Sequence, residues 1–174
     1  MTVRVATERL DLVACAADVI RASLEDPSRA GALLEASVPS DWPSEDLHDA
    51  LPIFLRQAQE DPDGIVWGAW VMILRDERIV VGDIGFKGPP DAAGRVEIGY
   101  GVVSAFRRQG FAVEAARALV EWAFVNGART VTAECVADNL GSVLVLERIG
   151  MRRTGADGDL IRWSVSAAAS PSPG

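Results

Sequence analysis

The chain has 174 residues, of which 49% are hydrophobic, and a formal net charge of −8 from 17 basic and 25 acidic residues. This length suits one domain with a full core, and the acidic balance disfavours nonspecific binding to nucleic acid or to an anionic membrane. The longest apolar run, residues 65–74, is far shorter than the ~20 residues of a membrane-spanning helix. We therefore expect one cytoplasmic domain over residues 1–166, no nucleic-acid or membrane partner, and a disordered tail over residues 167–174.

Cysteine and histidine are scarce in this chain. Cys15 and Cys135 both lie in apolar, strand-like segments, which favours buried free thiols over a disulfide or a metal pair. His48 is the only histidine, and this argues against a histidine-based metal site or a His-dependent triad. No metal is expected.

The apolar periodicity of the first half predicts strands and helices in alternation, at residues 10–15 (strand), 17–25 (helix), 44–59 (helix), 65–74 (strand) and 78–86 (strand). Pro27 marks the end of the first helix. Ser44 is the expected N-cap of the second, and Pro52 is expected to kink that helix or to split it. Between the two helices, residues 38–43 form a rigid loop that carries Trp42.

The second half continues the alternation, at residues 95–102 (strand), 109–126 (helix), 130–136 (strand), 140–149 (helix), and 151–154 with 160–165 (hairpin). Gly127 and Gly150 follow the two helices and are the expected stops. The whole order of elements predicts an α+β fold, with a mixed sheet and helices on its faces.

The segment from Val96 to Ala123 is the most informative part of the chain. A buried strand that carries Glu97 leads into a loop, residues 107–112, at the mouth of an amphipathic helix. The loop matches the pattern Arg/Gln-x-x-Gly-x-Gly/Ala. At the start of a helix such a loop exposes unpaired backbone N–H groups, and the helix dipole adds to their positive potential. These groups suit a pyrophosphate.

Other phosphate-binding motifs do not fit. A Walker loop requires Gly-x-x-x-x-Gly-Lys-Ser/Thr, which is absent from the chain. A dinucleotide fingerprint requires Gly-x-Gly-x-x-Gly after a strand, but Gly99 and Gly101 lie within the strand and position 104 is Ser. The remaining alternative is that Gly110 is only a turn glycine that starts a helix.

Four segments occur in a characteristic order, namely residues 7–12, 95–102, 107–112 and 137–155. Together they resemble the GNAT superfamily of acetyl-CoA-dependent N-acetyltransferases, and in particular the branch of the ribosomal-protein N-terminal acetyltransferases. The resemblance spans residues 7–166. It implies a central, mixed, mostly antiparallel sheet flanked by helices. It also implies acetyl-CoA as co-substrate, and direct attack by a primary amine, either a protein N-terminus or a small amine, in a ternary complex.

The resemblance also implies which residues hold the cofactor. It places the backbone of Gly101, Val102 and Val103 along the pantetheine arm, and Asn139 and Ser142 near the same arm. The pyrophosphate would lie on the loop and helix start, formed by Arg107, Arg108, Gln109, Gly110, Phe111 and Ala112. The purely structural alternatives are an ordinary strand end for residues 101–103, a solvated loop face for the two arginines, and an N-cap role for Asn139.

Catalysis requires a proton acceptor, and Glu97 matches the catalytic glutamate of several GNAT enzymes. A carboxylate within an apolar strand is uncommon, although it can also be a half-exposed partner of Arg95 or of a neighbouring strand. Asp83 in the preceding strand is a second candidate. The family's usual acid, a tyrosine, is replaced by Leu146, so Ser142 is the expected hydrogen-bond donor to the leaving group. The only tyrosine is Tyr100.

The acceptor pocket carries no recognisable specificity motif. Trp42 is the aromatic residue placed to cover it, and Asp83 is a candidate to contact the substrate. Trp67 and Trp70 lie in a predicted strand, where tryptophans are more often core. A non-catalytic acyl-CoA sensor or interaction module is the alternative function, and a homodimer is left open.

Overall fold

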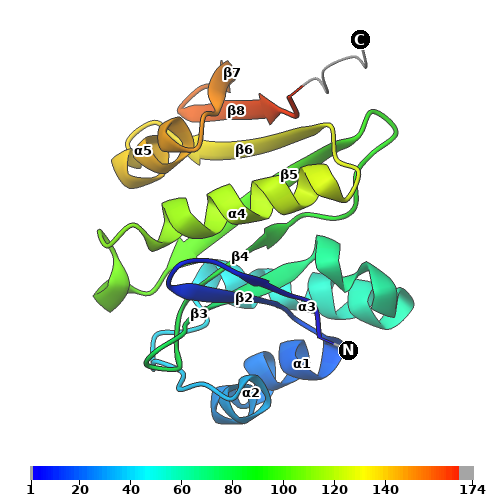
Figure 1. Ribbon diagram of the computed structural model, residues 1–174, viewed down its shortest axis with the longest axis vertical. Helices are drawn as coiled ribbons and strands as arrows, with labels where there is room; N and C mark the ends of the chain where they lie inside the picture. Colours follow the sequence, from blue (N-terminus) through cyan, green and yellow to red (C-terminus); the bar gives the residue numbers. More distant parts are fainter. Residues whose placement is uncertain (1, 169–174) are drawn as a thin grey trace.

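The computed structural model describes residues 2–168, and within them eight strands form one sheet (Figure 1). The spatial order of the strands is β1-β2-β3-β4-β5-β6-β8-β7. Their bounds are β1 Arg4–Ala6, β2 Leu10–Ala14, β3 Ala69–Leu74, β4 Ile79–Phe86, β5 Arg95–Val102, β6 Thr130–Val136, β7 Arg152–Asp157 and β8 Leu160–Ser166. All neighbouring strands are antiparallel except β5 and β6, which are parallel. The predicted mixed, mostly antiparallel sheet is therefore confirmed.

Five α-helices lie on the two faces of the sheet among the described residues, namely α1 Ala17–Glu25, α2 Pro27–Leu34, α3 Glu45–Glu60, α4 Phe111–Val125 and α5 Leu140–Arg148. Figure 1 looks at the face that α4 covers. Leu119 of α4 packs there in one core cluster with Val96 and Ile98 of β5. On the opposite face, the apolar sides of α1, α2 and α3 form a second cluster with Val71 and Val80. The protein thus has two hydrophobic cores, one on each face of the sheet.

Several predicted elements differ from the structure. The segment predicted as a strand from residue 65 begins as a 3₁₀ helix, Pro62–Trp67, and β3 starts only at Ala69. Pro62 favours the first turn, and the Gly68 N–H donates to Ile65 O at 3.0 Å, which closes it. Strand β1 and helix α2 were not predicted. Pro27 not only follows α1 but also starts α2, with the Asp26 side chain accepting from the Ser28 N–H as its cap.

Other local predictions are confirmed. Ser44 caps α3 by accepting a hydrogen bond from the Leu47 N–H at 3.2 Å. The expected split at Pro52 is not found, since α3 continues through this residue; the missing donor affects only one carbonyl, that of the exposed His48, which water can reach. Cys15 and Cys135 are both free and buried.

Two predictions concern the ends of the chain and its relation to membranes. The predicted disordered tail falls largely on residues 169–174, which lie outside the described residues. Within residues 2–168, no helix has the length and apolarity needed to cross a bilayer.

Candidate active site

Strands β5 and β6 pair only at their beginnings. The parallel register joins residues 95–97 to residues 130–132 and then stops. Beyond this point β5 stays with β4 as far as Val102, while β6 stays with β8 as far as Val136. The two strands therefore diverge, and they leave a gap in the middle of the sheet that opens just after Glu97.

The hydrogen bonds to β4 determine which peptide groups of β5 face this gap. The Val103 N–H donates to Val81 O at 2.8 Å, and the Glu97 carbonyl accepts from the Lys87 N–H at 3.0 Å. Because peptide groups alternate in direction along a strand, Gly101 also faces β4, whereas Tyr100 and Val102 face the gap. Of the three residues expected beside the cofactor arm, only Val102 presents its N–H to it. Tyr100 was missed, although the alternation rule alone could have found it.

The gap leads to the N-terminus of α4. A short 3₁₀ helix, Ser104–Phe106, turns the chain, and the next loop places Arg108 at φ 62° and Gly110 at φ 82°. Gly110 is the N-cap and has no side chain to bond the first turn. No protein acceptor within residues 2–168 is found for the N–H groups of residues 108–113. These groups and the positive end of the α4 dipole form a candidate anion site.

The arginines of this loop are exposed, but one of them also has a structural contact. Arg107 Nε donates to Val102 O at 3.1 Å, which ties the loop back to the end of β5. Arg108 makes no hydrogen bond or ion pair among the described residues. Arg108 is thus the freer of the two cations for a phosphate.

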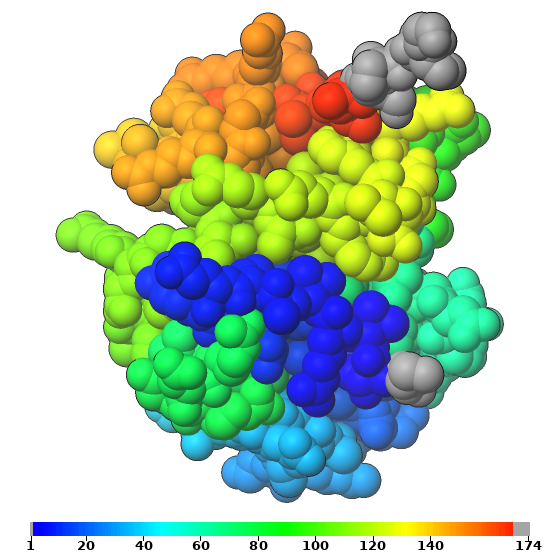
Figure 2. All heavy atoms as spheres, viewed as in Figure 1, coloured from blue at the N-terminus to red at the C-terminus, as the bar shows by residue number. Residues whose placement is uncertain are grey.

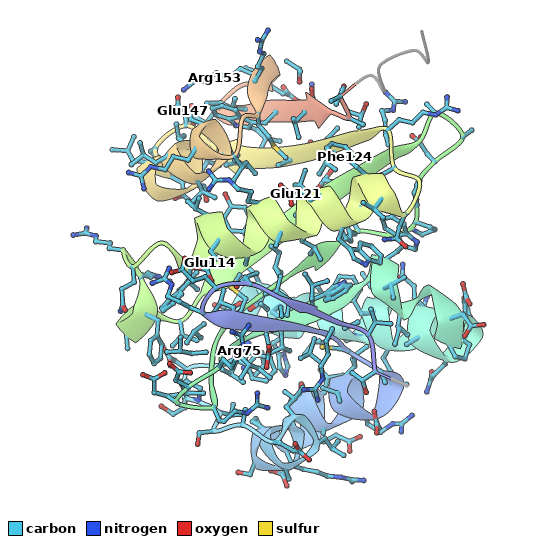
Figure 3. All side chains as sticks on the ribbon, in the orientation of Figure 1. Arg75, Glu114, Glu121, Phe124, Glu147 and Arg153 are labelled. Atoms are coloured by element: carbon cyan, nitrogen blue, oxygen red, sulfur yellow. The ribbon has the colours of Figure 1, made fainter. Side chains whose placement is uncertain are left out.

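The start of α4 is fixed in place by the turn between β1 and β2. The carboxylate of Glu114, in the first turn of α4, accepts hydrogen bonds from Thr7 Oγ1 at 2.6 Å and from Arg9 N and Nε, both at 2.9 Å. The Arg9 guanidinium also lies 4.3 Å from the centre of the Phe111 ring. Figure 3 shows Glu114 at the end of α4 that lies beside this turn. The N-terminal motif therefore positions the anion site.

Helix α5 borders the gap from the other side. The Asn139 side chain accepts from the Ser142 N–H at 3.1 Å, so it does serve as the N-cap of α5. The Tyr100 hydroxyl donates to Ser142 O at 3.4 Å and thereby bridges β5 and α5. Burial raises the pKa of Tyr100 to about 12, so the hydroxyl keeps its proton. Leu146 is 1% exposed and belongs to the core. It therefore offers no hydrogen-bond donor at the position where the family usually has a tyrosine.

The opposite face of β4 and β5 forms a floor with few side chains. The register sets Asp83 beside Gly101 and Gly85 beside Gly99, and Lys87 follows next to Glu97. A Cβ atom built on Gly99 would meet nothing within 4 Å. A Cβ on Gly101 would meet only the two carboxylate oxygens of Asp83, at 3.8 and 3.9 Å. The floor is thus a stretch without side chains that has one carboxylate at each end.

The carboxylate of Glu97 already has a partner. It forms an ion pair with Lys87 Nζ, and its side chain is 27% exposed. Arg95 instead pairs with Asp91 at 3.3 Å. The alternative considered from the sequence, a half-exposed glutamate paired with a neighbouring strand, is therefore what the structure contains. The proton-acceptor role of Glu97 stays a prediction.

Asp83 has a different environment. Burial raises the pKa of its carboxyl to about 7; the nearby side-chain N–H of Trp42 opposes the rise, and the charge of Asp46 adds to it. The Trp42 Nε1 atom has no hydrogen-bond partner at standard geometry in the described part of the chain. Its N–H therefore offsets only part of the cost of burying the Asp83 charge. Trp42 is 3% exposed, and it therefore forms a buried wall beside Asp83 rather than an exposed cover.

The loop that holds Trp42 is joined to the end of β5. The Ser104 hydroxyl donates to a carboxylate oxygen of Asp41 at 3.3 Å. This contact brings the loop of residues 38–43 next to Ser104, which lies two residues after the end of β5. The sequence offered no signal for it, because the partners lie 63 residues apart.

Known proteins share this architecture. Residues 9–152 match the family model described as the acetyltransferase (GNAT) domain. The uncharacterized N-acetyltransferase YjdG of Bacillus subtilis (strain 168) is 32% identical over 145 residues, which cover 83% of this chain and 86% of that protein.

Solved structures agree on the fold. RimL, a ribosomal L7/L12 alpha-N-protein acetyltransferase in complex with coenzyme A, superposes with a TM-score of 0.69 at 19% identity, over 98% of this chain and 100% of that one. The microcin C7 self-immunity acetyltransferase MccE, solved with acetyl-CoA and AMP, gives a TM-score of 0.63 at 15% identity, over 92% and 93%. At these identities the likeness concerns the fold alone.

Proposed function

Because the chain belongs to the GNAT acetyltransferase family, we propose that it moves the acetyl group of acetyl-CoA to a primary amine by direct attack within a ternary complex. The acetyl donor of this fold is acetyl-CoA. The observation that carries the proposal is the gap between β5 and β6, which leads directly to the free N–H groups at the start of α4.

The residues present suit such a cofactor. The free N–H groups of residues 108–113 would hold the pyrophosphate, with Arg108 and Arg107 beside it. The peptide group of Tyr100 would pair with an amide of the pantetheine arm, as the next strand would have done, and the Val102 N–H would remain free for the acetyl end of the cofactor. Asn139 and Ser142 border the same gap from α5.

The cofactor would supply a thioester: a neutral amine nitrogen would form the new C–N bond, the C–S bond would break, and one nitrogen proton would pass to the negatively charged sulfur as it leaves. The Val102 N–H, the last one of β5 that faces the gap, would donate to the carbonyl oxygen as negative charge develops there. One such donor contributes roughly 3–4 kcal/mol in comparable sites. Since Val102 is held by β4 and by Arg107, this donor is fixed before the substrate binds.

Helix α5 offers no tyrosine to the leaving sulfur, because Leu146 occupies the position of the family's usual acid. A thiol of pKa ~8.5 can leave without an acid. The Tyr100 hydroxyl reaches the backbone of Ser142 at the start of α5, so both residues lie beside this part of the gap. We propose that Ser142 donates a hydrogen bond to the sulfur and that Tyr100 orients the first turn of α5.

The acceptor we favour is the α-amino group of a protein N-terminus. The resemblance to the ribosomal-protein branch supports it, and RimL carries that activity in its name. A small amine is the alternative acceptor for the same reaction. A cytoplasmic location and a homodimer stay predictions.

The test is a calorimetric titration with acetyl-CoA followed by a thiol-release assay over peptides, polyamines, amino acids and aminoglycosides. We expect binding and turnover on at least one class of amine. No binding at high micromolar acetyl-CoA would contradict the cofactor proposal. Tight binding with no turnover across the panel would instead favour the acyl-CoA sensor.

A further inference from the structure

We propose that Asp83, rather than Glu97, binds the ammonium group of the acceptor and takes its proton before acetyl transfer. This inference rests on the proposed transfer to an amine and names the site of the acceptor: the side-chain-free floor over Gly99 and Gly101, on the face of the sheet opposite α4.

The first argument is position. Asp83 pairs with Gly101 across β4 and β5, and Gly101 directly precedes Val102, whose N–H faces the gap. Glu97 lies four residues earlier on β5, about 13 Å away at roughly 3.3 Å per residue. Of the two carboxylates, Asp83 is therefore the nearer along the sheet to the point where the carbonyl would be held, with β5 between its strand and the gap.

The second argument is space. The Asp83 carboxylate points over Gly101, where a Cβ would touch its two oxygens and nothing else within 4 Å. The next position on this face, Gly99, is open as well. Buried Trp42 and Val103 belong to the apolar cluster on this face. An alkyl-ammonium group can thus reach the carboxylate over a floor without side chains, beside apolar neighbours.

The third argument is charge. No lysine, arginine or histidine of residues 2–168 forms an ion pair with Asp83. The charge of Asp46, at the start of α3, raises the pKa of Asp83. Asp83 in turn acts on the Cys15 thiol just after β2, whose pKa is raised to about 12 by burial, by Asp83 and by Asp18. A buried carboxylate among acidic neighbours lacks a cation, and an ammonium substrate supplies one.

The proton balance of the step is simple. One proton moves from the ammonium nitrogen to the Asp83 carboxylate, which becomes a neutral carboxylic acid. The freed lone pair forms the C–N bond, the C–S bond breaks, and the second nitrogen proton ends on the departing sulfur. With a pKa of about 7, Asp83 is half ionised at neutral pH, near the optimum for a general base at that pH. Glu97 stays bound to Lys87.

The test compares Asp83→Asn with Glu97→Gln, with Asp49→Asn on the exposed side of α3 as the control. The measured quantities are the acetyl-CoA Kd and the pH dependence of kcat/KM for the best amine of the panel. We expect wild-type kcat/KM to rise through an apparent pKa near 7. Asp83→Asn should lose ~10²-fold or more at pH 7, keep its acetyl-CoA Kd, and recover at high pH, where the amine arrives neutral.

Glu97→Gln should lose less than Asp83→Asn and keep the rise near pH 7. Wild-type turnover of Asp83→Asn, or loss of the rise in Glu97→Gln alone, would overturn the inference. Gly101→Ala is a second variant, because its methyl group would occupy the proposed ammonium position without a clash. It should raise the KM for the amine and leave the acetyl-CoA Kd unchanged.

A binding measurement separates this inference from the proposed function. A tetrapeptide with a free N-terminus and putrescine are titrated into the protein loaded with coenzyme A. If no amine turns over, the proposed transferase function fails. Asp83 is still supported as the ammonium site if wild type binds either amine and Asp83→Asn does not, and it is rejected if the two proteins bind alike or neither binds.

Discussion

Asp83 illustrates, at the scale of single residues, how a functional group can oppose stability. Its pKa in the folded protein is about 7, against 3.8 for the free side chain. Between these values the folded state binds more protons than the unfolded state, so the free energy of unfolding falls as pH rises through this window and is lowest above pH 7. The charge thus destabilises the fold at neutral pH, by up to about 4 kcal/mol.

Asp83→Asn should therefore stabilise the protein while it reduces activity. The neutral amide keeps the shape of the side chain and removes the charge. Thermal unfolding followed between pH 4 and pH 8 should give a Tm several degrees above that of wild type at pH 8, and the difference should vanish towards pH 4. A lower Tm for the variant at pH 8 would mean that the carboxylate has a cationic partner in the folded state.

Gly110 presents a second residue-scale choice, since it occupies a positive φ at the head of α4. Asn and Asp tolerate this conformation better than other residues with a side chain, and both have the same shape. Gly110→Asp places a negative charge where the pyrophosphate is proposed to bind, whereas Gly110→Asn does not. Titration with acetyl-CoA should show a loss of ~10²-fold or more for Asp and a much smaller one for Asn. Equal losses would indicate that shape, not charge, weakens binding.

Helix α4 is the element on which the anion site depends, and Glu114 fixes its first turn. Partial burial alone would raise the pKa of Glu114, but the hydrogen bonds from Thr7 and Arg9 outweigh it, and the pKa is lowered. A lowered pKa contributes stability above the unfolded value of 4.5, and this contribution is lost as pH falls through the folded value.

Glu114→Gln should lower the free energy of unfolding at pH 7 by about 1–3 kcal/mol. Denaturant titration measures this loss of stability. Glu121→Gln is the control, because Glu121 is exposed and lies two turns further along α4 (Figure 3). The control should stay within ~0.5 kcal/mol of wild type. The deficit of Glu114→Gln should narrow below pH 4. A deficit that is constant with pH would show that the charge of Glu114 is not what holds the turn.

The elements also show which parts of the structure sequence can predict. Local signals were sufficient where the cause is local: Ser44 as a cap, Gly127 as a stop, alternation in β2. They were overlooked for residues 65–67 and for α2, where local signals also exist: Pro62 starts the 3₁₀ turn, and Asp26 caps the helix that Pro27 starts. By contrast, Lys87 pairs with Glu97, and Asp46 influences Asp83, only because tertiary structure brings them together. Residue types were readable from the motifs, but their partners were not.

On the scale of the whole molecule, the sheet consists of two parts with one narrow connection. Strands β1–β5 and strands β6–β8 are joined by only the three residue pairs at residues 95–97 and 130–132. Figure 2 shows α4 as a band between the N-terminal hairpin and the C-terminal strands on this face. A ligand that fills the gap would add a strand-like link between the two parts. Because it binds the folded state only, it should raise the stability by about 2.7 kcal/mol at 100 times its Kd.

This link should be visible amide by amide in hydrogen exchange. On addition of acetyl-CoA, the N–H groups of Tyr100 and Val102, which face the gap, should become protected, as should those at the start of α4. The Val103 N–H, one residue after β5, already donates to Val81 O, so it provides the control next to Val102 and should change little. Protection of Val103 in place of Val102 would mean that β5 presents its other set of peptide groups to the ligand. Uniform protection along β5 would indicate global stabilisation instead of a new hydrogen-bonded neighbour.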